Sequence, residues 1–199
     1  MTNVATAELD HSSVDLSTVK FTAEQYERVC EANPDRSFEL TAQGVLVVMP
    51  PVGVESGNYE SELLGDLVAW NRKTRLGKTF SSSTVFTLPN GSKKSPDAAW
   101  VELSRWEAVS KEERKKFALL VPDFVIELRS ETDRLTPLQA KMVEYRDNGV
   151  RLGWLINPRD REVEIYRLDC DVEVLADPLT LSGGDVLPSF TLDLSSIWA

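Results

Sequence analysis

The chain has 199 residues, a formal net charge of −10 and a hydrophobic fraction of 42%. This length predicts one domain with a sizeable apolar core, which we place at residues 19–199 after a polar, disordered tail at 1–18. The acidic balance argues against a protein that coats nucleic acid through general positive charge. No apolar run is long enough for a membrane span. Two cysteines without CxxC spacing, and the lack of a basic and apolar leader, favour a cytoplasmic protein with reduced thiols.

The only histidine is His11, in the polar tail. Ser-His-Asp and Cys-His triads need a histidine beside the nucleophile, and zinc sites commonly use one. Any catalysis therefore has to use carboxylates, lysine or a bound metal.

A helix and a β-hairpin are predicted near the N-terminus. Thr22 and Gln25 have the spacing of a capping box, so a helix is expected to start there and to end at about residue 31. Two apolar runs, at residues 38–40 and 45–49, flank a Gln-Gly pair, which indicates a β-hairpin.

Residues 53–58 are expected to form a loop, and apolar residues at helical spacing predict a helix over 59–72. Glu60 precedes Leu63 and Leu64 by three and four positions, so it shares their buried face. A carboxylate on such a face is costly unless something pairs with it. Glu60 is either an acid near the positive end of the helix dipole or a side chain that points at an active site.

Residues 67–94 contain no acidic residue. The basic residues in this stretch are Arg72, Lys73, Arg75, Lys78, Lys93 and Lys94. In an acidic protein they either form a local positive field that steers a phosphate backbone or are ordinary solvated residues of helix ends and hairpin loops.

Strands are predicted at residues 79–82 and 84–88, and Asn90-Gly91 is typical of a hairpin turn. The returning strand is expected at 95–101. Asp97 lies near its start, where the preceding proline fixes the backbone.

After a charged, helical insert at 104–117, a strand is predicted at 123–129. Its continuous Phe-Val-Ile run indicates a strand covered on both faces. Glu127 within this strand would strongly disfavour folding as a bare charge. A metal ion, or a salt bridge to Arg129 or Lys141, would relieve that cost.

A helix is expected over residues 135–148, with further strands at 152–156, 162–166 and 172–175, and then a tail with a turn and a few apolar contacts. Lys141 lies at the edge of the helix's apolar stripe. Its long side chain either extends into solvent or lies along the sheet and brings the ammonium to a polar centre.

Two strand carboxylates and an ammonium, from Asp97, Glu127 and Lys141, are what metal-assisted phosphodiester hydrolysis needs. Carboxylate oxygens hold a hard divalent cation. The cation polarises the phosphoryl oxygen and lowers the pKa of a bound water, and the lysine orients the water or stabilises developing negative charge.

The order of these elements resembles the PD-(D/E)XK nuclease superfamily, and more closely the Uma family of restriction-endonuclease-like proteins. The matching stretches lie between about residues 20 and 195, at 38–40, 44–50, 57–58, 95–97, 122–127, 139–145 and 149–158. The resemblance implies an α/β (α+β) fold. Its restriction-endonuclease-like core would be a mixed central sheet flanked by helices, in the order αβββαβ, with an N-terminal hairpin.

The resemblance implies a Mg²⁺-dependent endonuclease in which Mn²⁺ could replace Mg²⁺. Asp97 and Glu127 would bind the metal, with the Leu128 carbonyl as a candidate third ligand. Glu60 occupies the polar position that the family has on its first helix.

The superfamily has a lysine two residues after the glutamate, where this chain has Arg129. Arginine keeps the charge but cannot act as a base at neutral pH. The family resemblance moves the lysine to the following helix, at Lys141. Arg129 would then contact phosphate or pair with a carboxylate.

The implied partner is nucleic acid, with DNA as the expected substrate, and a homodimer is expected because each chain carries one site for two strands. The competing interpretation is a nuclease-fold module without turnover, kept for DNA binding or self-association. It predicts no uptake of Mg²⁺ or Mn²⁺. A transferase or lyase for a small acidic substrate is disfavoured by the single histidine and by the lack of a glycine-rich phosphate loop.

Overall fold

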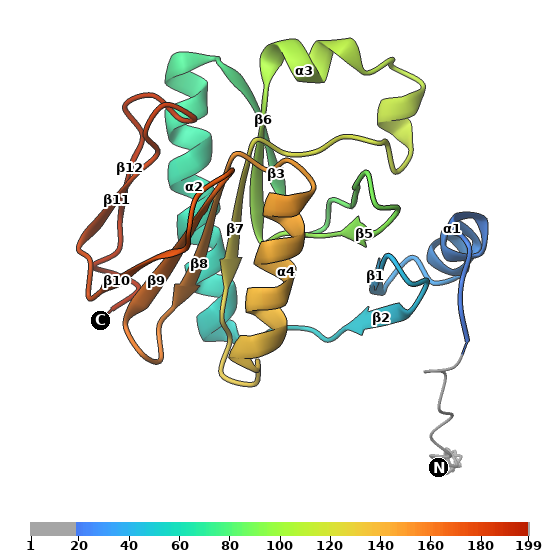
Figure 1. The fold of residues 1–199 in the computed structure, drawn as a ribbon, viewed down its shortest axis with the longest axis horizontal. Coiled ribbons are helices and arrows are strands. Elements are labelled where there is room, and N and C mark those ends of the chain that lie inside the picture. Colours follow the sequence, from blue (N-terminus) through green and yellow to red (C-terminus); the bar gives the residue numbers. More distant parts are fainter. Residues whose placement is uncertain (1–18, 199) are drawn as a thin grey trace, which may run out of the picture.

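The computed structural model describes residues 19–198, so the tail predicted at 1–18 lies outside the described residues. A six-stranded sheet forms the centre, in the order β10-β9-β8-β7-β6-β3 (Figure 1). Its strands are β3 (Gly77–Ser81), β6 (Ala98–Glu102), β7 (Phe124–Leu128), β8 (Leu152–Asn157), β9 (Glu162–Arg167) and β10 (Glu173–Ala176). Strands β7 and β8 are parallel, and the other neighbouring pairs are antiparallel.

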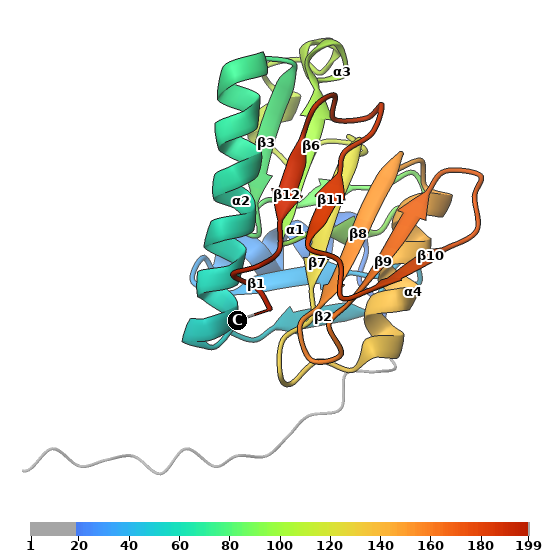
Figure 2. The same cartoon turned by 90° about the vertical axis from the view of Figure 1, so that its left-hand side faces the viewer.

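Two helices cover the opposite faces of this sheet (Figure 2). Helix α2 (Val54–Thr74) packs on one face, and α4 (Leu135–Asp147), the crossover between the parallel strands, packs on the other. The elements α2, β3, β6, β7, α4 and β8 follow the predicted order αβββαβ. The predicted mixed central sheet flanked by helices, with an N-terminal hairpin, is therefore confirmed.

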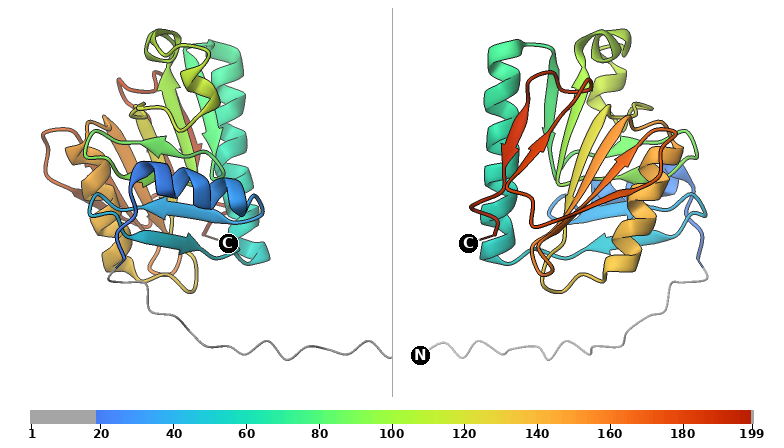
Figure 3. Two further views of the ribbon diagram at one scale, coloured as in Figure 1. Left: turned by 90° about the vertical axis from the view of Figure 1, so that its right-hand side faces the viewer. Right: turned by 60° about the vertical axis from the view of Figure 1, so that its left-hand side comes forward.

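A second sheet, in the order β2-β1-β5-β4, lies beside the first. It consists of β1 (Ser37–Leu40), β2 (Leu46–Met49), β4 (Phe86–Thr87) and β5 (Lys93–Lys94). The predicted hairpin is β1–β2, and α1 (Ala23–Ala32) starts at the predicted capping box of Thr22 and Gln25. Figure 3 shows α1 and this hairpin side by side, where the Tyr26 hydroxyl donates to the Phe38 carbonyl at 2.7 Å.

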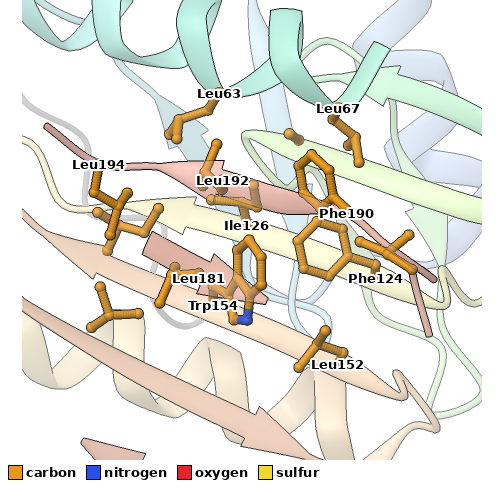
Figure 4. Close-up of a cluster of buried hydrophobic side chains, with 14 of the residues drawn as sticks. Leu63, Leu67, Phe124, Ile126, Leu152, Trp154, Leu181, Phe190, Leu192 and Leu194 are labelled. Carbon is orange, nitrogen blue, oxygen red and sulfur yellow. The ribbon is translucent and has the colours of Figure 1, made fainter. Parts of the chain in front are cut away.

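The C-terminal segment completes the core on the α2 face. Strands β11 (Thr180–Ser182) and β12 (Thr191–Asp193) form a hairpin where only a turn and a few contacts were predicted. Its residues pack with Leu63 of α2 and with the central strands (Figure 4). The Phe190 ring stacks on Trp154, with centroids 6.1 Å apart. The segment is therefore part of the main apolar core.

Several predicted boundaries are wrong, and two of them bear on the site. The expected loop at 53–58 is helical from Val54 onward, because a glycine such as Gly57 costs a helix only about 1 kcal/mol, which the packing of a long helix offsets. The expected strand at 95–101 begins only at Ala98, as β6, which pairs with β3, and the short strand β5 before it pairs with β4. Pro96 lies between β5 and β6 and has no N–H for a strand ladder. Asp97 therefore lies where the chain passes from one sheet to the other.

The charged insert after β6 contains α3 (Leu103–Ala108) and a 3₁₀ turn (Glu113–Lys115). Ser110 and Glu113 exchange hydrogen bonds as a capping box before this turn. Among residues 19–198, no helix has both the length and the apolar content for crossing a bilayer.

Candidate active site

Asp97 lies directly before β6, and Glu127 lies in the neighbouring strand β7. Ala98 faces Ile126 in the antiparallel ladder of β6 and β7, and continuing this register by one residue places position 97 opposite position 127. Residues two positions further along each strand belong to the cluster that packs on α4, so both carboxylates are on the α4 side. The Leu128 N–H donates to Asp97 Oδ2 at 2.6 Å. The fold thus brings the two predicted carboxylates together on one face.

Lys141 reaches these carboxylates from α4. Its Nζ lies 2.8 Å from Glu127 Oε1, 2.8 Å from Glu39 Oε1 and 3.1 Å from the Ser95 carbonyl oxygen. The side chain is only 10% exposed. Of the two alternatives for Lys141, the structure shows the ammonium at a polar centre.

Glu39 is a site residue that the sequence analysis missed. It comes from β1 and is 4% exposed, and its Oε1 accepts the Ser95 N–H at 2.9 Å. Its Oε2 lies 3.6 Å from Lys94 Nζ. The signal in the sequence was an acid between Phe38 and Leu40, but a strand pattern alone would direct it to solvent. The position is buried because the second sheet packs against the first at this point.

A chain of charges extends from this centre towards the surface. Lys94 Nζ also lies 3.2 Å from Glu144 Oε2, and Glu144 Oε1 accepts a hydrogen bond from the Asn90 side chain at 2.8 Å. At the other end, the Tyr145 hydroxyl donates to Glu127 Oε1 at 3.0 Å. Each buried charge in the chain has an opposite charge or a donor beside it, as buried charges require.

The electrostatics separate the carboxylates into two kinds. Burial raises the pKa of Asp97 well above its usual range, and the nearby Glu127 charge raises it further. Burial also raises the pKa of Glu127, although Lys141 opposes the shift. Burial alone would raise the pKa of Glu39, but Lys141 and Lys94 outweigh it and the pKa is lowered. The positive charge near Asp97 and Glu127 therefore does not offset the cost of burying their negative charge, whereas Lys141 and Lys94 do offset it for Glu39.

Burial alone would lower the pKa of Lys141, but the charges of Glu127, Glu39 and Asp97 outweigh it. The net effect is a raised pKa. Lys141 is therefore an ammonium at neutral pH.

These groups line a cavity of about 860 Å³. Residues 47–56 of the β2–α2 segment form one wall, and residues 130–133 of the β7–α4 loop form part of the other. Glu60 also lines the cavity, with the Ser82 hydroxyl 3.5 Å from its Oε2, and burial raises the pKa of Glu60. Of the two alternatives for Glu60, the structure therefore supports the second, because the side chain faces the candidate site.

The donor set fits a hard divalent cation. Within residues 19–198, Asp97 Oδ1 and Glu127 Oε2 accept no hydrogen bond, so each carboxylate keeps one oxygen for a ligand. Leu128 lines the same cavity. The described residues contain no group of three or more Asp, Glu, His or Cys side chains that could hold a metal. Two carboxylates suffice for Mg²⁺, which takes its other ligands from water and substrate phosphate.

The predicted basic residues do not form one surface. Lys93 is buried, with Nζ 3.0 Å from Thr87 Oγ1, and Lys94 is buried in the ion chain. Arg129 is bound to Asp160 at 2.9 Å, where it pairs with a carboxylate. Of the two alternatives for Arg129, the structure shows the pairing with a carboxylate. Lys93 and Lys94, expected either to steer a phosphate backbone or to be solvated, are instead buried.

Arg72, Lys73 and Lys78 are exposed, but they lie at the far end of α2 and at the start of β3. Lys73 follows Glu60 by 13 positions on the helix, which is about 20 Å at 1.5 Å per residue. Their contact with nucleic acid stays a prediction, and it would have to occur at a distance from the cavity.

Comparison with known proteins gives a family and a fold. The model of the Uma2 family, described as "Putative restriction endonuclease", matches residues 23–195. A solved structure from Anabaena variabilis, a "putative nuclease belonging to DUF820", superposes with a TM-score of 0.75 at 19% sequence identity. It covers 89% of this chain and 97% of its own. No curated protein matches. At this identity the structural likeness supports the fold, and the family match covers most of the chain.

Proposed function

Because the chain belongs to the Uma2 family, we propose that it is a metal-dependent endonuclease that hydrolyses phosphodiester bonds of nucleic acid, with DNA as the expected substrate. One observation carries the proposal. Asp97 and Glu127 line one cavity, each with an oxygen that accepts no hydrogen bond from residues 19–198, and the Lys141 ammonium lies 2.8 Å from Glu127.

In this proposal, Asp97, Glu127 and the Leu128 carbonyl would hold Mg²⁺ or Mn²⁺. The cation would supply Lewis-acid polarisation of a phosphoryl oxygen and a water of lowered pKa. The raised pKa values of the two carboxylates support this assignment, since a divalent cation would offset both their burial and their mutual repulsion.

Lys141 acts through its charge. Because the surrounding carboxylates keep it protonated, it is a hydrogen-bond donor and not a general base. A donor at this position stabilises negative charge that develops on the phosphoryl oxygens, and it can orient the attacking water. Glu60, on the same cavity, is assigned to positioning water at the cavity wall.

The remaining features of the proposal concern the substrate and the assembly. Arg72, Lys73 and Lys78 would contact the backbone of a long substrate that extends along α2. A homodimer would bring two sites to the two strands of a duplex. We place the protein in the cytoplasm, in keeping with its free cysteines.

A plasmid-nicking assay tests the proposal. Purified protein is expected to convert supercoiled plasmid to nicked and linear forms with Mg²⁺ or Mn²⁺, and EDTA and the Asp97→Ala substitution are each expected to abolish this. Equal cleavage by the wild-type and Asp97→Ala proteins would show that the activity comes from elsewhere.

A second candidate function is a binding module without turnover. Two observations favour it. Lys141 already neutralises part of the Glu127 charge, and residues 19–198 contain no group of three or more acidic, His or Cys side chains that could hold a metal. Calorimetric titration discriminates between the two. No heat of Mn²⁺ binding would favour the module, and one saturable event lost in Asp97→Ala would favour the nuclease.

A further inference from the structure

We propose that Glu39 is a positioning residue for Lys141. It holds the ammonium in place when a metal ion takes up Glu127, and Lys94 is its counter-ion. The role given to this contact rests on the proposed function. The contact between Glu39 and Lys141 can itself be tested in the metal-free protein.

Lys141 has two carboxylate partners at the same distance. Its Nζ lies 2.8 Å from Glu127 Oε1 and 2.8 Å from Glu39 Oε1. Glu127 is the proposed metal ligand, so a bound metal ion would weaken the attraction between Glu127 and the Lys141 ammonium. Without a second carboxylate partner, the flexible Lys141 side chain would lose its fixed position. Glu39 and the Ser95 carbonyl oxygen, at 3.1 Å, are the partners that remain.

Glu39 is itself fixed from two directions. Its Oε1 accepts the Ser95 N–H, and its Oε2 faces Lys94 at 3.6 Å. Strands β1 and β5 pair with Leu40 opposite Lys93, so the same register places Glu39 opposite Lys94. Lys94 is in turn held by Glu144 at 3.2 Å. The second sheet therefore supplies a rigid anion to a lysine that belongs to the first.

Burying such a set of charges brings little stability compared with apolar packing, and buried ion pairs are best attested where they specify one arrangement. Here the arrangement that is specified is the direction of the Lys141 side chain. Lys94, 3.6 Å from Glu39 Oε2, balances part of the charge of the carboxylate that fixes this direction.

The first experiment needs no metal. Glu127→Gln removes the charge that pairs with Lys141, as metal binding would. Acetylation of Lys141 by acetic anhydride, read by mass spectrometry, is expected to stay low in Glu127→Gln. It is expected to rise several-fold in the Glu127→Gln/Glu39→Gln double variant. Equal acetylation of Lys141 in both variants overturns the proposal.

The second experiment separates positioning from charge balance. In Glu39→Gln, Lys141 has only Glu127 as a carboxylate partner at short range, so it competes with the metal. Mn²⁺ affinity and kcat are each expected to fall about 10-fold or more, as for other groups that orient a metal site. The double variant Glu39→Gln/Lys94→Met removes one anion and one cation. It should regain stability towards urea but neither Mn²⁺ affinity nor kcat.

If the double variant regains all three, Glu39 only balances charge and the inference is wrong. If wild-type protein neither binds Mn²⁺ nor cuts nucleic acid, the proposed function fails. The acetylation result then decides the anchoring separately, because it needs neither metal nor substrate.

Discussion

Replacing Asp97 by Asn is expected to stabilise the metal-free protein while it removes metal binding. Asp97 lies one residue before β6, and continuing the β6–β7 register places it opposite Glu127, where the Cβ atoms of facing residues lie about 5 Å apart. Two unit charges at that distance, in an effective dielectric of about 20, repel each other by about 3 kcal/mol. Lys141, at 2.8 Å from Glu127, cancels part of this. Asn keeps an oxygen that can accept the Leu128 N–H.

The expected net gain in the free energy of unfolding is about 0.5–2 kcal/mol, the usual range for a stabilising substitution. For a chain of this size each kcal/mol raises Tm by about 2–4 °C. The measurement is urea unfolding of the wild-type and Asp97→Asn proteins at pH 7, first with EDTA and then with about 5 mM Mn²⁺ in place of EDTA. Mn²⁺ should stabilise the wild-type protein and leave Asp97→Asn unchanged.

Glu131→Gln is the matched control, because it removes a carboxylate from the wall of the same cavity, where the side chain is 76% exposed. Its unfolding free energy should change by less than about 0.5 kcal/mol. A metal-free Asp97→Asn protein that is less stable than wild type would refute the electrostatic reasoning, since removing a repelled charge cannot then be the main effect.

Other expectations concern the ion network and the backbone. Lys141→Met leaves buried carboxylates unpaired and should cost about 3–5 kcal/mol in urea unfolding, and a loss below 1 kcal/mol would contradict the network. The folded-state pKa of Glu39 is lowered, so its stabilisation is present above the unfolded pKa of about 4.5 and is lost as pH falls through the folded pKa. The penalty of Glu39→Gln should therefore be largest near pH 7 and shrink below about pH 4, and a penalty independent of pH would count against the ion pairs. Gly77→Ala places a Cβ 2.2 Å from a backbone oxygen and should lower Tm clearly, whereas Gly65→Ala, with nothing within 4 Å, should raise stability by about 0.4–1 kcal/mol. A thermal scan in which the two glycine substitutions behave alike would show that the close contact is relieved.

The predictable part of the site came from patterns within a few residues. The continuous apolar run at 124–126 predicted a strand buried on both faces, and that strand carries Glu127. A pattern of this kind is local, because burial on both faces requires apolar residues at successive positions. The helix period placed Lys141 at the edge of an apolar stripe, which left both solvent and a polar centre within its reach, and the structure decided between them.

The unpredicted part depended on contacts between distant segments. Glu39 pairs with Lys141 across 102 positions (141 − 39), and no local pattern reports a partner so far along the chain. Lys93 and Lys94 were expected either to form a positive field or to be solvated loop residues, yet both are buried because β5 pairs with β1 in the second sheet.

By itself, the sequence determined the helices and strands of the αβββαβ core, their order, and the residues that bring carboxylates and an ammonium to the central strands. Those features follow from propensity, capping and hydrophobic period, which act between near neighbours. Only the tertiary structure decided which charged side chains pair and which cations are buried inside the protein. It also decided that the C-terminal hairpin completes the core. Burial and ion pairing depend on which surfaces pack together, and that is settled when segments remote in the chain come into contact.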